Sequence, residues 1–154
     1  MKQIIIGKSG IGKSRICVRN AILNYSGKVI LVNSYDATEY LGLDKIGLTT
    51  VLLENINEIN DFEKLQVNTH CIQGGIGESK ELICNFIKKH IYDENTLLII
   101  EETSNIAPEC VPLIMSAKNL KADVIMIFQS EEQFELCHGD KVNMEDCIKT
   151  LSWY

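Results

Sequence analysis

The segment from residue 2 to residue 14 constrains the fold of this chain more than any other. It reads Lys-Gln-Ile-Ile-Ile-Gly-Lys-Ser-Gly-Ile-Gly-Lys-Ser. The three consecutive isoleucines predict a fully buried strand, Lys2–Ile6, and a glycine-rich loop and an apolar-periodic helix follow it. A buried strand joined to a helix in this way is typical of a parallel sheet whose two faces are covered by helices.

The loop after this strand fills the P-loop pattern G-x-x-x-x-G-K-[ST] from Gly7 to Ser14. Its glycines allow backbone conformations in which successive N–H groups point at a phosphate chain, and the following helix adds its positive end. Lys13 can reach the β- and γ-phosphates, and the Ser14 hydroxyl is placed to bind Mg²⁺. The residues expected around a nucleoside triphosphate are Gly7, Lys8, Ser9, Gly10, Ile11, Gly12, Lys13, Ser14 and Arg15.

Length and charge limit what else the chain can contain. With 154 residues, 45% of them apolar, it can bury one good core, which predicts a single domain over residues 1–154. The formal net charge is −6, and the only arginines are Arg15 and Arg19. This balance argues against a surface that holds nucleic acid by phosphate neutralisation alone.

Cysteine usage and hydropathy indicate the compartment. The six cysteines form no C-x-x-C pair, so neither a zinc site nor a redox motif is predicted and reduced thiols are expected. No apolar stretch is long enough for a membrane span, and the first residues do not form a leader peptide. We therefore expect a cytoplasmic protein.

Apolar runs and helical periodicity alternate along the chain, as a parallel α/β sheet requires. The expected strands are Lys2–Ile6, Lys28–Asn33, Thr49–Leu53, His70–Gln73, Thr96–Glu101, Asp123–Gln129 and Cys147–Trp153. The expected helices are Lys13–Tyr25, Asn57–Leu65, Glu78–His90, a crossover helix between Pro108 and Leu120, and Glu131–Cys137. In the first helix, Ile16, Ala21, Leu23 and their neighbours are expected to form the buried side.

A second motif consists of four apolar residues and two acids, Leu97-Leu98-Ile99-Ile100-Glu101-Glu102. Taken alone, such an ending also fits a strand that simply meets solvent. Beside a P-loop it resembles a Walker B strand, because parallel strands deliver their terminal residues to the edge where the P-loop opens. Glu101 would then lie near Mg²⁺, usually through a water, and Glu102 would polarise the water that attacks the γ-phosphate. Glu101 is one methylene longer than the usual Asp.

A polar amide follows the next apolar strand. Val124-Ile125-Met126-Ile127-Phe128 ends in Gln129 and Ser130. A glutamine at this place can simply cap a strand. It can also hydrogen-bond the γ-phosphate or the attacking water, and so distinguish a triphosphate from a diphosphate.

These three features together resemble the P-loop ATPases with an additional strand and a catalytic glutamate. The Phe-Gln-Ser ending is most similar to the FtsK/HerA-like branch, which includes DNA pumps, conjugation ATPases and zonula occludens toxin-like ATPases of filamentous phages. The resemblance implies a three-layer α/β fold of the RecA/FtsK type, with a mainly parallel sheet, helices on both faces, and the P-loop strand between the Gln129 strand and a later edge strand. It also implies Mg²⁺-dependent hydrolysis of ATP coupled to work on DNA, often in a ring. Carried over, the catalytic roles fall to Lys13, Glu102 and Gln129, and the Mg²⁺ contacts to Ser14 and Glu101.

Two departures from that family are visible. Ring motors of this branch usually receive an arginine finger from a neighbour, and the region before the Gln129 strand offers only lysines, of which Lys118 is a weak substitute. The chain also carries no appended DNA-binding domain. Either another chain of a homo-oligomeric or mixed complex supplies the DNA contact, or the ATPase has another task.

Two other classes of function therefore stay open. A small-molecule or nucleotide kinase shares the P-loop and the size, and Asp36 lies where a kinase holds an acceptor hydroxyl; the lack of any arginine after Arg19 counts against a phosphate-covering lid. A nucleotide-dependent switch with little hydrolysis is the third interpretation. No guanine-recognition motif is present, but the sequence does not identify the base.

Overall fold

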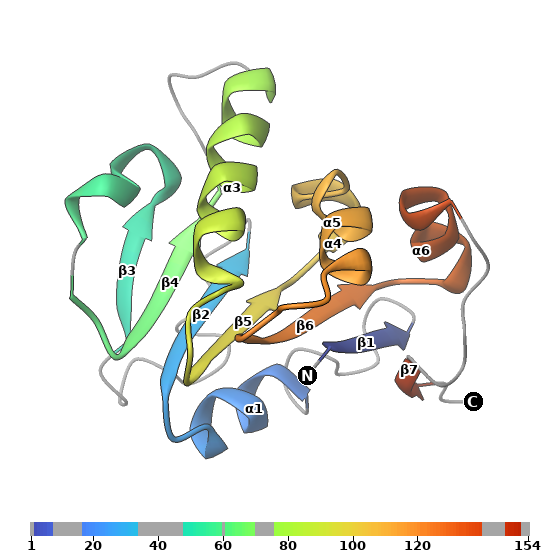
Figure 1. The fold of residues 1–154 in the computed structure, drawn as a ribbon, viewed down its shortest axis with the longest axis horizontal. Helices are drawn as coiled ribbons and strands as arrows, with labels where there is room; N and C mark the ends of the chain where they lie inside the picture. Colours follow the sequence, from blue (N-terminus) through green and yellow to red (C-terminus); the bar gives the residue numbers. More distant parts are fainter. Residues whose placement is uncertain are drawn as a thin grey trace.

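The fold is a single parallel sheet. The computed structural model describes residues 2–7, 17–33, 48–59, 61–69, 76–139 and 147–151. The strands are β1 Lys2–Gly7, β2 Lys28–Asn33, β3 Thr49–Leu52, β4 Lys64–Asn68, β5 Thr96–Ile100, β6 Asp123–Phe128 and β7 Cys147–Leu151. They pair in the order β3-β4-β2-β5-β6-β1-β7, and every pairing is parallel (Figure 1).

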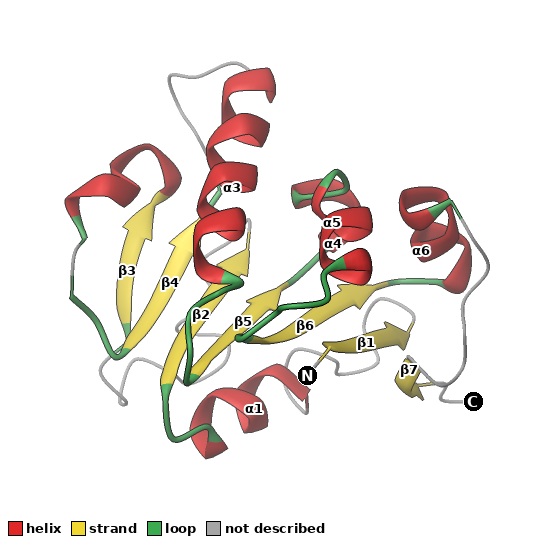
Figure 2. Ribbon diagram, in the orientation of Figure 1, coloured by secondary structure: helices red, strands yellow, loops and turns green. Residues whose placement is uncertain are grey.

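Helices cover both faces of this sheet. They are α1 Arg19–Asn24, the 3₁₀ helix η3 Leu53–Glu58, α3 Ile76–His90, α4 Thr103–Ile106, α5 Cys110–Ser116 and α6 Glu131–His138. Helix α1 lies on one face, below the sheet in Figure 2, whereas α3, α4, α5 and α6 lie on the other face. The predicted fold class, α/β with a parallel central sheet and helices on both faces, is confirmed.

The core explains why the central strands are continuous apolar runs. In β5, Leu98 and Ile100 are buried against the helices α3 and α5, and Leu97 and Ile99 are buried on the α1 face. Successive side chains of a strand point to opposite faces, so a strand that is covered twice needs apolar residues at every position. Each such side chain contributes about 1.5–3 kcal/mol when fully buried.

The position of β1 agrees with the arrangement that the family resemblance implies. β1 pairs with β6 on one side and with β7 on the other. β7 is an edge strand of the sheet, as expected for the last predicted strand. The P-loop sequence therefore follows a strand that has a neighbour on each side.

The prediction of a helix over Asn57–Leu65 is wrong. The 3₁₀ helix η3 includes only the first two residues of this range and ends at Glu58, and β4 begins at Lys64. β4 is a central strand, between β3 and β2, in which Leu65 and Val67 face one hydrophobic cluster. The buried Gln66 between them interrupted the apolar run that would have marked a strand. The predicted strand His70–Gln73 lies outside the described residues.

The first helix turns a different side inward than expected. Its buried residues are Val18 and Ile22, which are four positions apart and therefore share one helix face. Leu23 is 38% exposed, so its predicted burial is wrong. Ala21 packs at the border of the same cluster, and Ile16 lies outside the described residues.

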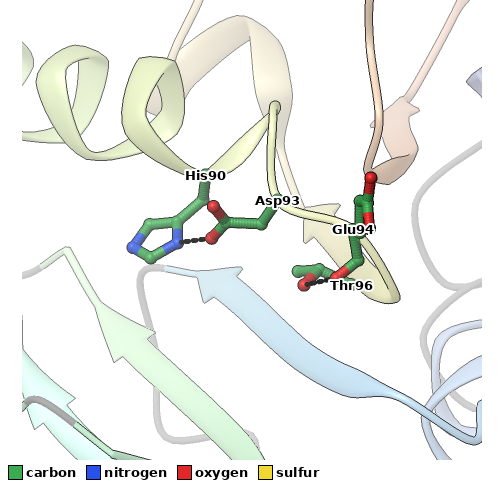
Figure 3. Close-up of polar contacts among 4 residues, drawn as sticks. All are labelled: His90, Asp93, Glu94 and Thr96. Atoms are coloured by element: carbon green, nitrogen blue, oxygen red, sulfur yellow. Dashed lines mark hydrogen bonds and ion pairs between the residues drawn. The ribbon is translucent and has the colours of Figure 1, made fainter.

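A polar turn connects α3 to β5 at the amino edge of the sheet (Figure 3). His90 Nδ1 lies 2.6 Å from Asp93 Oδ2, and Thr96 Oγ1 donates to the Glu94 carbonyl at 3.1 Å. Asn95 has a left-handed backbone, with φ 53°. This turn closes the end of β5 that is opposite to its two acids.

Candidate active site

The predicted site residues lie at the carboxyl edge of three adjacent strands. β5, β6 and β1 are consecutive in the sheet, with Ile100 paired to Met126 and Ile6 paired to Phe128. Parallel strands end at the same edge, so the fold brings together residues that are far apart in the sequence. Of the predicted site residues, the structure describes Gly7, Glu101, Glu102 and Gln129, and all four lie at this edge.

The rest of the predicted P-loop, residues 8–15, lies outside the described residues. This segment includes Lys13 and Ser14, and it lies in the chain between β1 and α1. Its contacts with phosphate and Mg²⁺ stay a prediction from the sequence.

Glu101 continues the pairing of β5 by one residue. Its backbone N–H donates to the Val32 carbonyl at 3.0 Å, and the residue is 2% exposed. The alternation of the strand places it on the face of Leu97 and Ile99, where α1 also lies. An ionised carboxylate is costly to bury unless a cation or hydrogen-bond donors compensate it. The contact of Glu101 with Mg²⁺ stays a prediction from the sequence.

Glu102 has an unusual backbone conformation. Its φ and ψ are both 48°, in the left-handed region, and its carbonyl accepts from the N–H groups of Asn105 at 2.9 Å and Ile106 at 3.0 Å. A residue with a Cβ costs roughly 1–3 kcal/mol in such a conformation, and strain of this kind is concentrated at functional sites. The strain makes Glu102 a stronger candidate for a functional acid than its place after a strand alone.

Thr103 is a buried polar residue that sequence analysis missed. It is 0% exposed, its Oγ1 donates to the Ile100 carbonyl at 2.8 Å, and it accepts from the Ile127 N–H at 3.1 Å. The hydroxyl thus joins the end of β5 to β6. A hydroxyl directly after the two acids was visible in the sequence, but its partner is 24 positions away.

Gln129 is exposed, and its backbone is fixed by a second glutamine. The Gln129 N–H donates to Gln133 Oε1 at 3.0 Å, and Ser104 Oγ donates to the same oxygen at 3.3 Å. Ser130 Oγ accepts from the Gln133 N–H at 3.2 Å and so caps α6. The Ser-x-x-Gln spacing is a helix-start signature that could have identified Gln133.

A row of polar side chains extends from the site toward the β3 edge of the sheet; Asn33 and Gln66 in it are buried, and Thr50 is exposed. Thr50 Oγ1 donates to Gln66 Oε1 at 3.2 Å, and Gln66 Nε2 donates to Asn33 Oδ1 at 3.1 Å. Asn33 is 0% exposed and stands next to Glu101, because Val32 pairs with Ile100. Its Nδ2 has no partner in the part of the chain that the structure describes. The sequence marked Asn33 only as the end of a strand.

Two other candidates do not join this edge. Lys118 is exposed and lies before β6, at the amino edge of the sheet. The six residues of β6 separate the two edges by about 20 Å, so Lys118 cannot reach the site of its own chain. Asp36 lies outside the described residues.

Comparison with known proteins shows a distant likeness of fold. No family profile matches the sequence, and no curated protein matches it. The chain is similar to the crystal structure of the DNA-packaging ATPase from Sulfolobus Turreted Icosahedral Virus, with a TM-score of 0.51. The identity is 16%, over 88% of this chain and 69% of that chain. At this identity the likeness defines the class of fold, a parallel α/β sheet shared with that ATPase.

The described ranges contain neither a helix suited to span a membrane nor a cluster of metal-binding side chains. None of the helices in these ranges combines the length and the apolar character that crossing a membrane requires. The same ranges hold no group of three or more His, Cys, Asp or Glu residues arranged to bind a metal ion. The Mg²⁺ contacts of Ser14 and Glu101 stay a prediction, and Ser14 lies outside the described residues.

Proposed function

We propose that this chain is a single-domain, cytoplasmic ATPase that binds ATP with Mg²⁺ and hydrolyses it to ADP and phosphate. One observation carries the proposal. A P-loop sequence directly follows β1, and the two strands beyond it on one side, β6 and β5, end at the same edge in Gln129 and in Glu101 followed by Glu102. The likeness to a viral DNA-packaging ATPase supports a place in a phage, plasmid or mobile-element assembly.

The proposed roles follow from the position of each residue. Lys13 binds the β- and γ-phosphates, Glu102 accepts a proton from the attacking water, and Gln129 contacts the γ-phosphate. The hydroxyl of Ser14 and the carboxylate of Glu101 would hold Mg²⁺, and both offer the hard oxygen atoms that this ion prefers. When bound, the ion supplies neutralisation of the charge on the phosphate oxygens.

The variant Glu102→Gln tests the reaction. It keeps the size and hydrogen bonding of the side chain but removes the base, so ATP binding should persist while hydrolysis falls by about 10²–10⁴-fold. Glu94→Gln is the matched control, because Glu94 is an exposed acid in the turn at the amino edge of the same strand. We expect the control to hydrolyse ATP as the parent does.

Phosphate release is measured with ATP and GTP, and with a panel of nucleosides as acceptors. Equal turnover in Glu102→Gln and the parent would contradict the proposal. Transfer of phosphate to an acceptor, without release of free phosphate, would identify a kinase. ATP binding with no detectable turnover would identify a switch.

We infer that full activity depends on association, with DNA engaged through the complex. No arginine follows Arg19, and Lys118 lies at the edge away from its own site, so we expect a cationic finger, in addition to Lys13, to come from a neighbouring subunit or a partner chain. The isolated chain should be slow, well below the ~10 s⁻¹ typical of enzymes. A finger in trans raises rates by up to ~10³-fold or more.

Specific activity as a function of protein concentration, with and without DNA, tests this dependence. It should rise as subunits associate, and Lys118→Ala should remove the rise if Lys118 is that group. A rate that is already fast at the lowest concentration, and flat above it, would contradict the inference.

A further inference from the structure

The two turns that carry the proposed catalytic groups are joined to each other. We call residues 101–104, after β5, the acid turn, and residues 129–133, after β6, the sensor turn. Two sets of hydrogen bonds, which we call bridges, connect them. One links the acid turn to the end of β6, and the other links the acid turn to the sensor turn. One bridge is buried and the other lies at the rim of the sheet.

The buried bridge is the hydroxyl of Thr103. The hydroxyl accepts a hydrogen bond from the Ile127 N–H and donates one to the Ile100 carbonyl. One oxygen atom thus links the ends of the two strands. The pairing of β5 with β6 ends with Ile100 and Met126, one residue before Ile127. The hydroxyl thus continues the connection between the strands after the backbone of β5 has turned away.

The outer bridge is the side-chain oxygen of Gln133. It accepts from the backbone N–H of Gln129 and from the hydroxyl of Ser104 at once. Gln133 itself is held by the Ser130 cap at the start of α6. A single oxygen atom therefore contacts both turns.

We propose that Thr103 and Gln133 are positioning residues that hold Glu102 and Gln129 as one unit. This inference rests on the proposed function. Glu102 adopts a strained left-handed conformation, which persists only where its surroundings impose it. Thr103 directly follows it and is anchored on both sides, so the hydroxyl fixes where the acid stands relative to the strand that ends in Gln129.

The variants Thr103→Val and Thr103→Ser test the buried bridge. Valine keeps the shape but loses both hydrogen bonds, and serine keeps the hydroxyl. A catalytic group that is misplaced by about 1 Å can lose roughly 10²-fold in rate, so we expect a kcat loss of that order in Thr103→Val. The KM for ATP should be unchanged, and Thr103→Ser should recover most of the rate.

Thr96→Val is the matched control for a lost buried hydroxyl. Thr96 is 1% exposed and lies on the same strand, but its hydroxyl donates to Glu94 at the amino edge (Figure 3). Urea unfolding should show that this variant is less stable than the parent, while its kcat should equal that of the parent. If Thr103→Val and Thr96→Val hydrolyse ATP equally well, the positioning role of Thr103 is overturned.

The Glu102→Gln background separates positioning from general loss of structure. If Thr103 acts through the Glu102 carboxylate, Thr103→Val should cause no further loss in this background, measured as single turnovers with protein in excess. An equal further loss in both backgrounds would show a merely structural role. If Glu102→Gln alone is as active as the parent, the proposed function fails, and that result is distinct from a failure of the bridges.

Gln133 provides a test that does not depend on folding of a core variant. It is half-buried, and Gln133→Leu removes the shared acceptor while Gln133→Glu keeps an oxygen that can accept both hydrogen bonds. We expect a kcat loss of about tenfold or more in the leucine variant, with rescue in the glutamate variant. Equal and unreduced rates in both variants would overturn the outer bridge.

Discussion

The left-handed backbone of Glu102 leads to a prediction in which stability and activity change in opposite directions. At φ 48° and ψ 48°, an L-residue with a Cβ costs roughly 1–2 kcal/mol, whereas glycine does not. Glu102→Gly and Glu102→Ala both remove the carboxylate, but only the glycine variant relieves the strain. The comparison between these two variants therefore isolates the backbone from the loss of the side chain.

The expected difference is about 1 kcal/mol in favour of glycine. Relief of the left-handed conformation contributes roughly 1–2 kcal/mol, and the greater flexibility of glycine in the unfolded chain offsets about 0.5–1 kcal/mol of it. The conformation itself should persist in both variants, because the carbonyl of residue 102 accepts two N–H groups and Thr103 is anchored to both strands. For a chain of this length, 1 kcal/mol corresponds to roughly 2–4 °C in Tm.

Urea unfolding at constant m-value measures the difference. Asn105 is the control position, since it is exposed in α4 and has no left-handed backbone. Asn105→Gly should be less stable than Asn105→Ala by up to about 1 kcal/mol, which is the opposite sign. If Glu102→Gly is also the less stable of its pair, the left-handed conformation at residue 102 is refuted. Both Glu102 variants should lose hydrolysis.

Three further predictions concern the P-loop sequence, the turn before β2 at the amino edge of the sheet, and the contact between helices α3 and α5. Lys13→Ala should abolish the affinity for ATP with Mg²⁺ in calorimetry without unfolding the chain, and unchanged affinity would contradict the P-loop interpretation. Gly27→Ala should destabilise the fold by about 1–3 kcal/mol in urea unfolding, because the new Cβ would clash with the Asn95 carbonyl oxygen; a neutral effect would contradict this packing. Cys84 Sγ and Cys110 Sγ are 3.2 Å apart, so diamide, which takes up the two hydrogens, should join them within one chain, as peptide mapping would detect. Burial and the neighbouring thiol raise the pKa of Cys110, so this oxidation should be slow at neutral pH and should become faster as the pH rises and more thiolate forms.

The central strands could be predicted from the sequence almost to the residue. β1, β2, β5 and β6 are covered on both faces, so each is an unbroken apolar run with polar residues at its ends. The order of the strands in the sheet is less visible, because it depends on pairings between distant segments. Here the family resemblance supplied what periodicity could not, namely the place of β1 between β6 and an edge strand.

The missed features all depend on tertiary partners. From the sequence alone, Gln66 fits a polar position in a helix or loop. Its burial in a strand is explained only by its partners Asn33 and Thr50 on the neighbouring strands. Thr103 reads as an ordinary start of a helix until the Ile127 N–H is placed against it. In both cases the side chain is buried because a specific partner satisfies it, and such a partner leaves no local pattern.

The lengths of the three site strands explain why an anchored turn is needed at the acid. Ile100 pairs with Met126, but β6 continues to Phe128, whose partner Ile6 directly precedes Gly7. The start of the P-loop and Gln129 are therefore level with each other, and Glu101 is set back by two residues, or about 7 Å. In the proposed ATPase this step sets the two acids back from the start of the P-loop and from Gln129. A β5 that ran on by two residues would bring its last residues level with both. The chain instead leaves the sheet at Glu102. The hydroxyl of Thr103 then connects the end of β5 to β6, in place of a further backbone hydrogen bond between these strands.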